Sequence, residues 1–243
     1  MKILKSRAYL VIVVALITLS VLPQLGSATL VWSETFDELD SEIWSTIWGE
    51  LEGGCLRGIV DEGISIYRNS AVTDGTWKFE LRKMTDWTVS PSVDNCHIYF
   101  ICIDVPSLSQ EYIALTLKQS FSGETEVTTY SIDKYDGSHS YLDTYTGEAI
   151  TTVIGVLHRF AITRTAGGLI SVYLNDSLIL QATDTDMTDT EYFGFWTRDD
   201  WAFDNIEVYD SIEIGSGSPL ILLAAGAGVV VVVIAVVLFV KRR

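Results

Sequence analysis

The stretch His158–Asp184, HRFAITRTAGGLISVYLNDSLILQATD, decides the fold class of this 243-residue chain. Its apolar and β-branched residues form three short runs, of which the first two are Phe160–Arg164 and Leu169–Leu174. The pairs Gly167-Gly168 and Asn175-Asp176 separate the runs, and two-residue connections of this kind are typical of β-hairpins. The stretch therefore predicts three consecutive antiparallel strands.

Similar runs occupy the chain before this stretch. They are Gly63–Asn69, Gly75–Met84, Asn95–Asp104, Glu111–Ser120 and Glu126–Tyr135. Apolar and charged residues alternate from Trp77 to Arg82, as they do in a strand with one face toward water. Between Thr29 and Ser218 no stretch sustains a helical period, and a single helical turn is expected in Asp37–Ser45. This pattern predicts an all-β sandwich or barrel.

Three segments resemble the concanavalin A-like lectin/glucanase jelly rolls, in particular the laminin G-like group. His158–Asp184 resembles the central hairpins of that family, with Asn175-Asp176 where the family usually has Asn-Gly or Asp-Gly. Glu191–Asp210 (EYFGFWTRDDWAFDNIEVYD) resembles its last two strands, and Phe36–Trp44 (FDELDSEIW) its first segment. The resemblance implies a jelly-roll β-sandwich, and a fold by itself does not assign a function.

A pattern of three carboxylates bears on whether the chain is an enzyme. Glu38, Asp40 and Glu42 match the Glu-x-Asp-x-Glu pattern of laminarinase-like glycoside hydrolases, which share the implied fold. Those enzymes need the carboxylates on a strand in the sugar cleft, so that one attacks while another protonates the leaving group. Here the match lies in a polar turn without apolar alternation. We therefore expect a non-catalytic domain and keep a membrane-tethered glycoside hydrolase as the alternative.

The expected function is a cell-surface binding module for a glycan or for adhesion, with a structural protein lacking a small ligand as a further alternative. Sugar binding uses exposed aromatic rings beside polar groups. Trp32, Trp77 and Trp196 alternate within strands, so they are expected in the core. The candidate ligand surface consists of loop residues, namely Trp201, Arg198, Asp199, Asp200 and Trp87.

The resemblance also implies a structural calcium ion between the first segment and the last strand. The matching residue of the last strand is Asp204, and its candidate partners from the opening segment are Glu34 and Asp37. Calcium prefers oxygen ligands of this kind. No other cofactor is expected.

The three cysteines allow one disulfide at most. Cys96 and Cys102 lie six residues apart on one expected strand, roughly 20 Å at 3.3 Å per residue. Bridged Cα atoms lie within about 7 Å of each other, so these two cannot pair. Cys55 therefore bridges to Cys96 or to Cys102, or all three thiols stay free. The even spacing places Cys96 and Cys102 on one face of the strand.

The C-terminal segment predicts a membrane anchor. Residues 220–240 contain only Leu, Ile, Val, Ala, Gly and Phe. This apolar run is long enough to cross a bilayer as a helix. The cationic residues 241–243 mark the cytoplasmic side. Residues 215–219 form a short linker, and residues 29–214 are the expected sandwich. The prediction is a single-pass type I protein with an extracellular domain.

The N-terminus agrees with export. Residues 1–28 combine a cationic start, a short apolar run and small residues before an expected cleavage site after Ala28. An uncleaved signal anchor is the alternative. In an exported domain, Asn175-Asp176-Ser177 is an acceptor sequence for N-glycosylation at Asn175.

The charge of the predicted outside portion excludes one class of partner. After the six cations of the two terminal segments are set aside, ten cations face 32 acidic residues, a net charge of −22. Such a surface repels phosphate backbones. Nucleic acid is therefore excluded, and an extracellular glycan or surface protein is the expected partner.

Overall fold

The computed structural model describes residues 28–58, 64–84, 95–104, 111–122, 125–148, 155–197 and 201–212, in which strands and no helix occur. The strands are β1 (Leu30–Glu34), β2 (Trp44–Trp48), β3 (Glu50–Leu51), β4 (Leu56–Arg57), β5 (Ile64–Asn69), β6 (Gly75–Lys83), β7 (Asn95–Cys102), β8 (Tyr112–Ser122), β9 (Thr125–Tyr135), β10 (His139–Glu148), β11 (His158–Arg164), β12 (Leu169–Leu174), β13 (Ser177–Thr183), β14 (Tyr192–Thr197) and β15 (Trp201–Tyr209). The all-β prediction is confirmed. The expected helical turn is a short hydrogen-bonded turn, in which the amide of Trp44 donates to the carbonyl of Asp40 at 2.8 Å.

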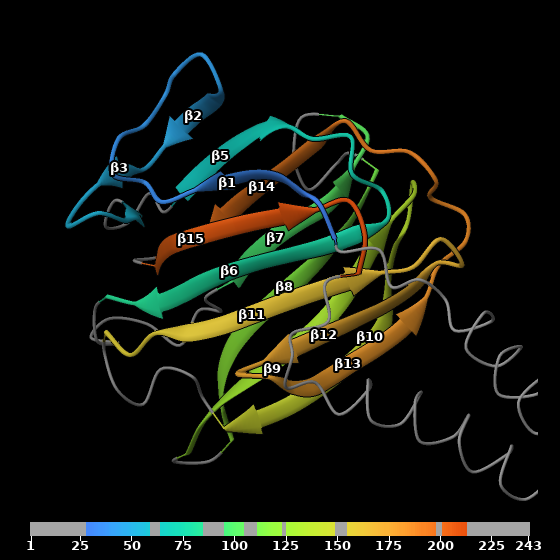
Figure 1. The fold of residues 1–243 in the computed structure, drawn as a ribbon. Coiled ribbons are helices and arrows are strands. Elements are labelled where there is room, and N and C mark those ends of the chain that lie inside the picture. Colours follow the sequence, from blue (N-terminus) through green and yellow to red (C-terminus); the bar gives the residue numbers. More distant parts are fainter. Residues whose placement is uncertain are drawn as a thin grey trace, which may run out of the picture.

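Two antiparallel sheets form a sandwich, as Figure 1 shows. Sheet A has the order β13-β12-β11-β6-β15-β4-β3, and β1 also pairs with β15. Sheet B has the order β10-β9-β8-β7-β14-β5-β2. The first and the last strand therefore lie side by side in sheet A, while the middle of the chain supplies most of sheet B.

The predicted double hairpin is present in sheet A. β11 pairs with β12, and β12 pairs with β13. At the second turn Asn175 has a φ of 47° and Asp176 a φ of 68°. A type I′ turn needs positive φ at both positions, and Asn and Asp adopt this conformation more readily than most residues. Asp176 is therefore tolerated at the turn position where the family usually has glycine.

Aromatic side chains fill the space between the sheets. Phe79 of β6 stacks on Phe160 of β11, with ring centroids 5.3 Å apart. Across the sandwich, Phe195 of β14 approaches Phe203 of β15 with centroids 3.9 Å apart. All four belong to one cluster to which both sheets contribute. Burial of this apolar surface is the main favourable contribution to folding.

A β-bulge in β15 decides which of its residues face the core. The register of β15 against β6 shifts after Asp204, and Asn205 has a φ of 48°. Trp201 and Phe203 are buried before the bulge, and Ile206 is buried after it. The extra residue changes the spacing of the buried positions from two residues to three, so apolar side chains on both sides of it reach the core.

A second bulge lies in β7, where the register against β8 shifts between Tyr99 and Ile101. The expectation that Cys96 and Cys102 share one face is therefore wrong, because one extra residue moves every later side chain to the opposite face. Cys96 belongs to the core between the sheets. Cys102 packs with Tyr99 in a separate cluster on the outer face of sheet B.

All three cysteines are free and buried. The thiol of Cys55 donates to the carbonyl of Glu52 at 2.9 Å, and the thiol of Cys102 donates to the carbonyl of Asp104 at 2.8 Å. The disulfide of Cys55 with Cys96 or Cys102 is not formed in this structure, which agrees with the alternative of three unpaired thiols.

Two buried cations hold the connection that follows β13. The ammonium of Lys134 donates to Asp184 Oδ2 at 2.6 Å. The guanidinium of Arg164 donates to the carbonyls of Asp184 and Met187 at 3.1 and 2.6 Å. Burial opposes ionisation of Asp184, but the hydrogen bond and charge of Lys134 outweigh it and lower the pKa of this carboxyl. The charged pair therefore fixes the loop.

Replacing Gly168 by alanine should lower the free energy of unfolding by about 1–3 kcal/mol. Gly168 has a φ of 77°, and a Cβ at this position would collide with the carbonyl of Asp184. Gly167→Ala is the matched control, because the nearest atom to its Cβ is Thr165 Oγ1 at 3.7 Å. Urea denaturation of both variants checks the prediction, and equal stabilities would contradict it.

The predicted terminal segments lie outside the described residues. These segments are residues 1–27 of the predicted signal and the apolar run 220–240. Within the described ranges, no helix has the length and apolar character needed to cross a bilayer. The membrane anchor and the signal therefore stay predictions from the sequence.

Candidate ligand-binding face

The outer face of sheet B carries an unusual set of aromatic and ionisable side chains. Strand alternation brings every second residue of β5, β7, β8, β9, β10 and β14 to this face, and the pairing of these strands sets them in rows. We call this set the aromatic face. Its members are Tyr67, His97, Tyr99, Tyr112, Asp133, Tyr135, His139, Tyr141, Tyr192 and Trp196.

The aromatic face has a buried floor and a more exposed rim. Tyr99, Tyr112, His97 and Asp133 form the floor and are at most 5% exposed. The rim residues keep part of their surface, and Tyr141 is 63% exposed. The partly exposed rim residues are Tyr67, Tyr135, His139, Tyr192 and Trp196. A ligand can therefore contact the rings at the rim, which lie over a covered polar floor.

Contacts between rings fix the orientation of the face. Tyr99 meets Tyr112 edge to face with centroids 5.1 Å apart, and Tyr112 is stacked with Tyr135 at 5.9 Å. Trp196 meets His97 edge to face at 5.3 Å. Such pairs are worth about 0.5–1.5 kcal/mol each, so the rings are held in place before any ligand arrives.

His97 is held neutral in the floor. Its Nδ1 lies 3.0 Å from the hydroxyl of Thr116, and its Nε2 has no hydrogen-bond partner in the protein. Burial is the main cause that lowers the pKa of His97 to about 4, and the nearby charge of Asp133 only partly opposes it. At neutral pH the imidazole therefore offers an uncharged, unsatisfied nitrogen to this face.

Two further floor atoms lack partners. They are the hydroxyl of Tyr99 and Oδ1 of Asp133. The other carboxylate oxygen of Asp133 lies 3.4 Å from Nε2 of His139. Burial raises the pKa of Tyr99 well above its usual value and that of Tyr112 to about 12, so both phenols remain donors. Buried polar atoms normally have partners, so three unsatisfied atoms on one face favour a ligand or ordered water there.

The structure places the predicted ligand residues differently. Trp201 is wrong as a stacking residue, because it is 0% exposed and faces the core at the start of β15. Trp196 is wrong as a core residue, because it lies on the aromatic face and packs against the outer cluster. Trp77 is confirmed in the core. The other predicted ligand residues, Trp87 and Arg198–Asp200, lie outside the described residues.

The carboxylates of the glycoside hydrolase pattern do not lie on the strands that form the aromatic face. Glu38, Asp40 and Glu42 are exposed in the connection between β1 and β2. Asp40 Oδ1 accepts the amide of Glu42 at 2.8 Å, the role of a turn-capping residue. This arrangement lacks the alternating strand positions that the catalytic pattern needs.

The predicted calcium ligands do not assemble as a set of three. Glu34 is occupied by protein donors: its Oε1 accepts the amide of Phe36 at 2.9 Å and its Oε2 the indole of Trp44 at 2.7 Å. Burial and, after it, the charges of Glu80 and Asp37 raise the pKa of Asp204, while the amide of Asn205 and the charge of Arg82 oppose the shift. The described residues contain no group of three metal-ligating side chains. Glu34 does not fit as a side-chain ligand, and calcium stays a prediction.

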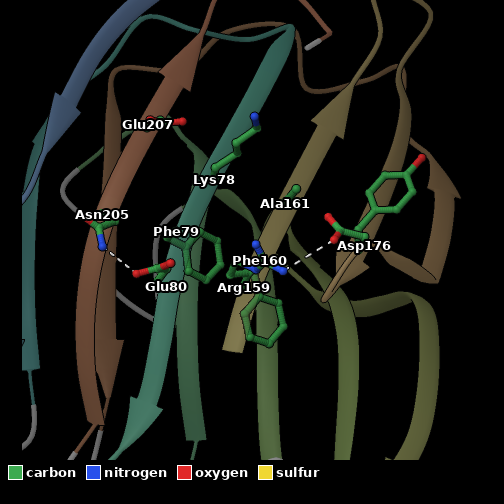
Figure 2. Close-up of a pocket in the computed structure, with 10 residues that line it drawn as sticks. Lys78, Phe79, Glu80, Arg159, Phe160, Ala161, Asp176, Asn205 and Glu207 are labelled. Carbon is green, nitrogen blue, oxygen red and sulfur yellow. Dashed lines mark hydrogen bonds and ion pairs between the residues drawn. The ribbon is translucent and has the colours of Figure 1, made fainter. Parts of the chain in front are cut away.

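A shallow hollow lies on the outer face of sheet A, as Figure 2 shows. Its polar side chains already contact one another: Asn205 donates to Glu80 at 2.6 Å, and Arg159 lies 3.7 Å from Asp176. The predicted glycosylation residue Asn175 is exposed beside it, and its side chain accepts the amide of Arg159 at 3.0 Å. Since several of its polar side chains already contact one another, this hollow is a weaker candidate than the aromatic face.

Several solved structures are similar to the chain. The carbohydrate recognition domain of Emp47p matches with a TM-score of 0.56 and 12% identity, over 77% of this chain and 99% of that domain. The laminarinase catalytic domain from Thermotoga maritima matches with a TM-score of 0.54 and 12% identity, over 77% and 100%. The β-glucanase of Bacillus licheniformis matches with a TM-score of 0.51 and 12% identity, over 76% and 99%.

These similarities establish the fold. The chain is a concanavalin A-like jelly-roll sandwich, as the sequence predicted. No protein-family model and no curated protein sequence matches it. At 12% identity the ligand and activity have to be argued from the residues of this chain.

Proposed function

We propose that the chain is a non-catalytic glycan-binding protein whose ligand lies on the aromatic face of sheet B. The observation that carries the proposal is the combination of partly exposed rings at the rim with three unsatisfied polar atoms in the floor. Sugar rings stack on aromatic faces, and their hydroxyls need both donors and acceptors. The unsatisfied atoms of His97, Tyr99 and Asp133 have this character, and they lie beneath the rings of the rim.

One feature of the face favours binding over hydrolysis. A glycoside hydrolase of the usual kind needs two carboxyl groups across the scissile bond, about 5–9.5 Å apart. Among the strand residues of sheet B whose side chains the structure describes, Asp133 is the carboxylate that faces outward. A single carboxylate supports a binding role.

The proposed setting is the cell surface, where the domain would serve recognition or adhesion. The support comes from the sequence: an N-terminal signal, the apolar run 220–240 and the cationic residues after it. The large negative charge of the domain is compatible with a neutral or cationic glycan and unfavourable for a polyanionic one.

A glycan array tests the proposal. We would use the full 243-residue chain in a polyoxyethylene detergent, because detergents with sugar head groups would compete for the site. The expected result is binding to a restricted set of glycans, without release of reducing sugar on prolonged incubation. A blank array would overturn the proposal, and release of reducing ends would favour the hydrolase alternative.

Replacing Trp196 by alanine should weaken glycan binding at least tenfold, about 1.4 kcal/mol. Trp196 is a partly exposed rim residue, and its ring is positioned by His97. Tyr173→Ala is the matched control, because Tyr173 is a partly exposed aromatic residue beside the hollow of sheet A. Titration calorimetry with an array hit measures both. Equal losses in the two variants would place the ligand elsewhere.

A further inference from the structure

The turn between β12 and β13 holds an asparagine whose side-chain nitrogen is available. Asn175 is the one asparagine of the sequence with a serine or threonine two residues later, which here is Ser177. Its backbone amide donates to the carbonyl of Arg159 at 2.8 Å, and its Oδ1 accepts the amide of Arg159 at 3.0 Å. Nδ2 of Asn175 has no hydrogen-bond partner among the residues that the structure describes. The side-chain amide is therefore fixed through its oxygen, while its nitrogen is left for another group.

This turn is accessible from outside the domain. Residues 175–178 are all exposed. The positive φ angles of Asn175 and Asp176 reverse the chain at the tip of a hairpin. Exposed tips with small polar residues are the places where a folded domain best tolerates additions. A bulky group on Nδ2 of Asn175 would therefore leave the core undisturbed.

The hollow on the outer face of sheet A lies next to this turn. Asp176 and Tyr173 are among its lining residues, and Figure 2 shows Asp176 facing the hollow together with Ala161 and Lys78. Ala161 lies directly opposite Lys78 on one side and Tyr173 on the other. All three are partly exposed, so the hollow is open to solvent. Its volume is about 280 Å³. Pockets for drug-sized ligands start at about 300 Å³, so this hollow suits a single sugar ring.

Tyr173 is placed to contact a sugar that is attached to Asn175. The hydrogen bonds of Asn175 to Arg159 continue the pairing of β11 with β12 by one residue. Alternation therefore brings the side chains of Tyr173 and Asn175 to the same face of the sheet, with Leu174 between them on the other. Two residues of a strand span roughly 7 Å, which a pyranose ring on Nδ2 can cover. Packing of the sugar on the ring of Tyr173 buries apolar surface of both.

The polar edge of the hollow is suited to an attached sugar more than to a free one. The side chains of Arg159 and Asp176 are 66% and 90% exposed, and their ionic contact is 3.7 Å long. So exposed a pair contributes little to stability, and either side chain can turn to a sugar hydroxyl at small cost. A covalent link keeps the sugar at a high effective concentration beside the hollow. A weak contact is then enough to hold it there.

We propose that Asn175 carries an N-linked glycan and that the first sugar of this glycan packs on Tyr173 in the hollow of sheet A. In the attachment step, Nδ2 of Asn175 attacks the anomeric carbon of an oligosaccharide bound to a lipid phosphate. A carbon–nitrogen bond forms, the bond from that carbon to the phosphate oxygen breaks, and the lipid phosphate leaves while Nδ2 loses one proton. A transferase outside the cytoplasm catalyses this step, so it needs the export that the sequence predicts.

Mass spectrometry of the full chain, purified from the membranes of the cells that naturally produce it, tests the attachment. We expect the peptide that contains Asn175 to carry a glycan and to lose it in Ser177→Ala. This variant removes the hydroxyl that the acceptor sequence requires, and it leaves Asn175 and its hydrogen bonds to Arg159 in place. An unmodified Asn175 in the natural chain would overturn the proposal.

Melting temperatures of the full chain test the contact with Tyr173. The glycosylated chain should melt about 2–4 °C above Ser177→Ala, the shift expected for one ring contact in a protein of this size. The same comparison in a Tyr173→Phe background, which keeps the ring, should give a similar difference. In a Tyr173→Ala background the difference should fall below half. Equal differences with and without the ring would overturn the packing in the hollow. Glycan binding at the aromatic face does not depend on either result, because that face belongs to sheet B.

Discussion

Replacing Phe79 by alanine should lower the free energy of unfolding by about 3–5 kcal/mol, the usual cost of truncating a buried phenylalanine. Phe79 is 1% exposed and stacks on Phe160. Its ring also meets those of Phe195 and Phe203, with centroids 6.1 and 6.4 Å away. Truncation therefore opens a cavity between the two sheets that β6, β11, β14 and β15 all border.

Urea denaturation followed by tryptophan fluorescence measures this effect. Phe79→Leu is the matched variant, because it keeps much of the buried volume while losing the stacked ring, and its loss should be clearly smaller. A change below about 1 kcal/mol for Phe79→Ala would contradict the assignment of this residue to the centre of the core, since buried truncations rarely cost so little.

Replacing Lys134 by methionine should lower the free energy of unfolding by about 3 kcal/mol or more at neutral pH. The side chains of Lys134 and Asp184 are 6% and 4% exposed, and their ionic contact is 2.6 Å long. Methionine preserves the packing of the stem but leaves the carboxylate of Asp184 buried without its cation. Breaking a buried pair in this way costs more than the pair contributes, because a lone buried charge remains.

The effect of Lys134→Met should depend on pH in a defined direction. In the wild type the pKa of Asp184 is lowered, so its contribution is present above the unfolded pKa and is lost as the pH falls through the folded value. In the variant, burial without the cation raises that pKa, and protonation relieves the cost. The difference between the two proteins should therefore shrink from neutral pH toward about pH 4.

Denaturation curves at several pH values check this expectation. Lys118→Met is the matched control, because Lys118 is an exposed residue on the neighbouring strand β8. It removes the same charge and should change stability by less than about 1 kcal/mol, without a comparable pH dependence. A pH-independent loss in Lys134→Met would show that packing, and not charge pairing, dominates at this site.

The aromatic face differs from the usual outer face of a sheet in a sandwich, and this difference makes it the candidate site. The sheet positions that face outward would ordinarily be polar and solvated, yet here Tyr99 and Tyr112 are buried and pack with Cys102 and Ala114. Their packing holds His97, Tyr99 and Asp133 with unsatisfied polar atoms. Such a face costs stability unless something binds it, which is why we assign the function there.

Part of this site could have been read from the sequence. In β7 the residues His97 and Tyr99 alternate with Cys96 and Ile98, so one face of the strand is polar and aromatic. Since Cys96 and Ile98 are the apolar set, they indicate the core side of β7, and His97 and Tyr99 are then expected on the opposite side. The sides of the sheets that the tryptophans occupy are less evident from the sequence. Trp196 and Trp201 both lie near strand ends, and alternation does not say which side of a strand faces the core.

The sequence by itself determined the all-β class, the double hairpin of β11–β13 and the jelly-roll resemblance, because strand alternation and turn residues are local signals. The tertiary structure alone decided which face each strand residue occupies after the bulges in β7 and β15. It placed Trp196 on the outer face of sheet B and Trp201 in the core, the reverse of the expectation. It also brought Asp133, Ala114 and Tyr99 into one row from three strands. Register between strands is set by contacts that are distant in sequence, and a shift of one residue exchanges the two faces.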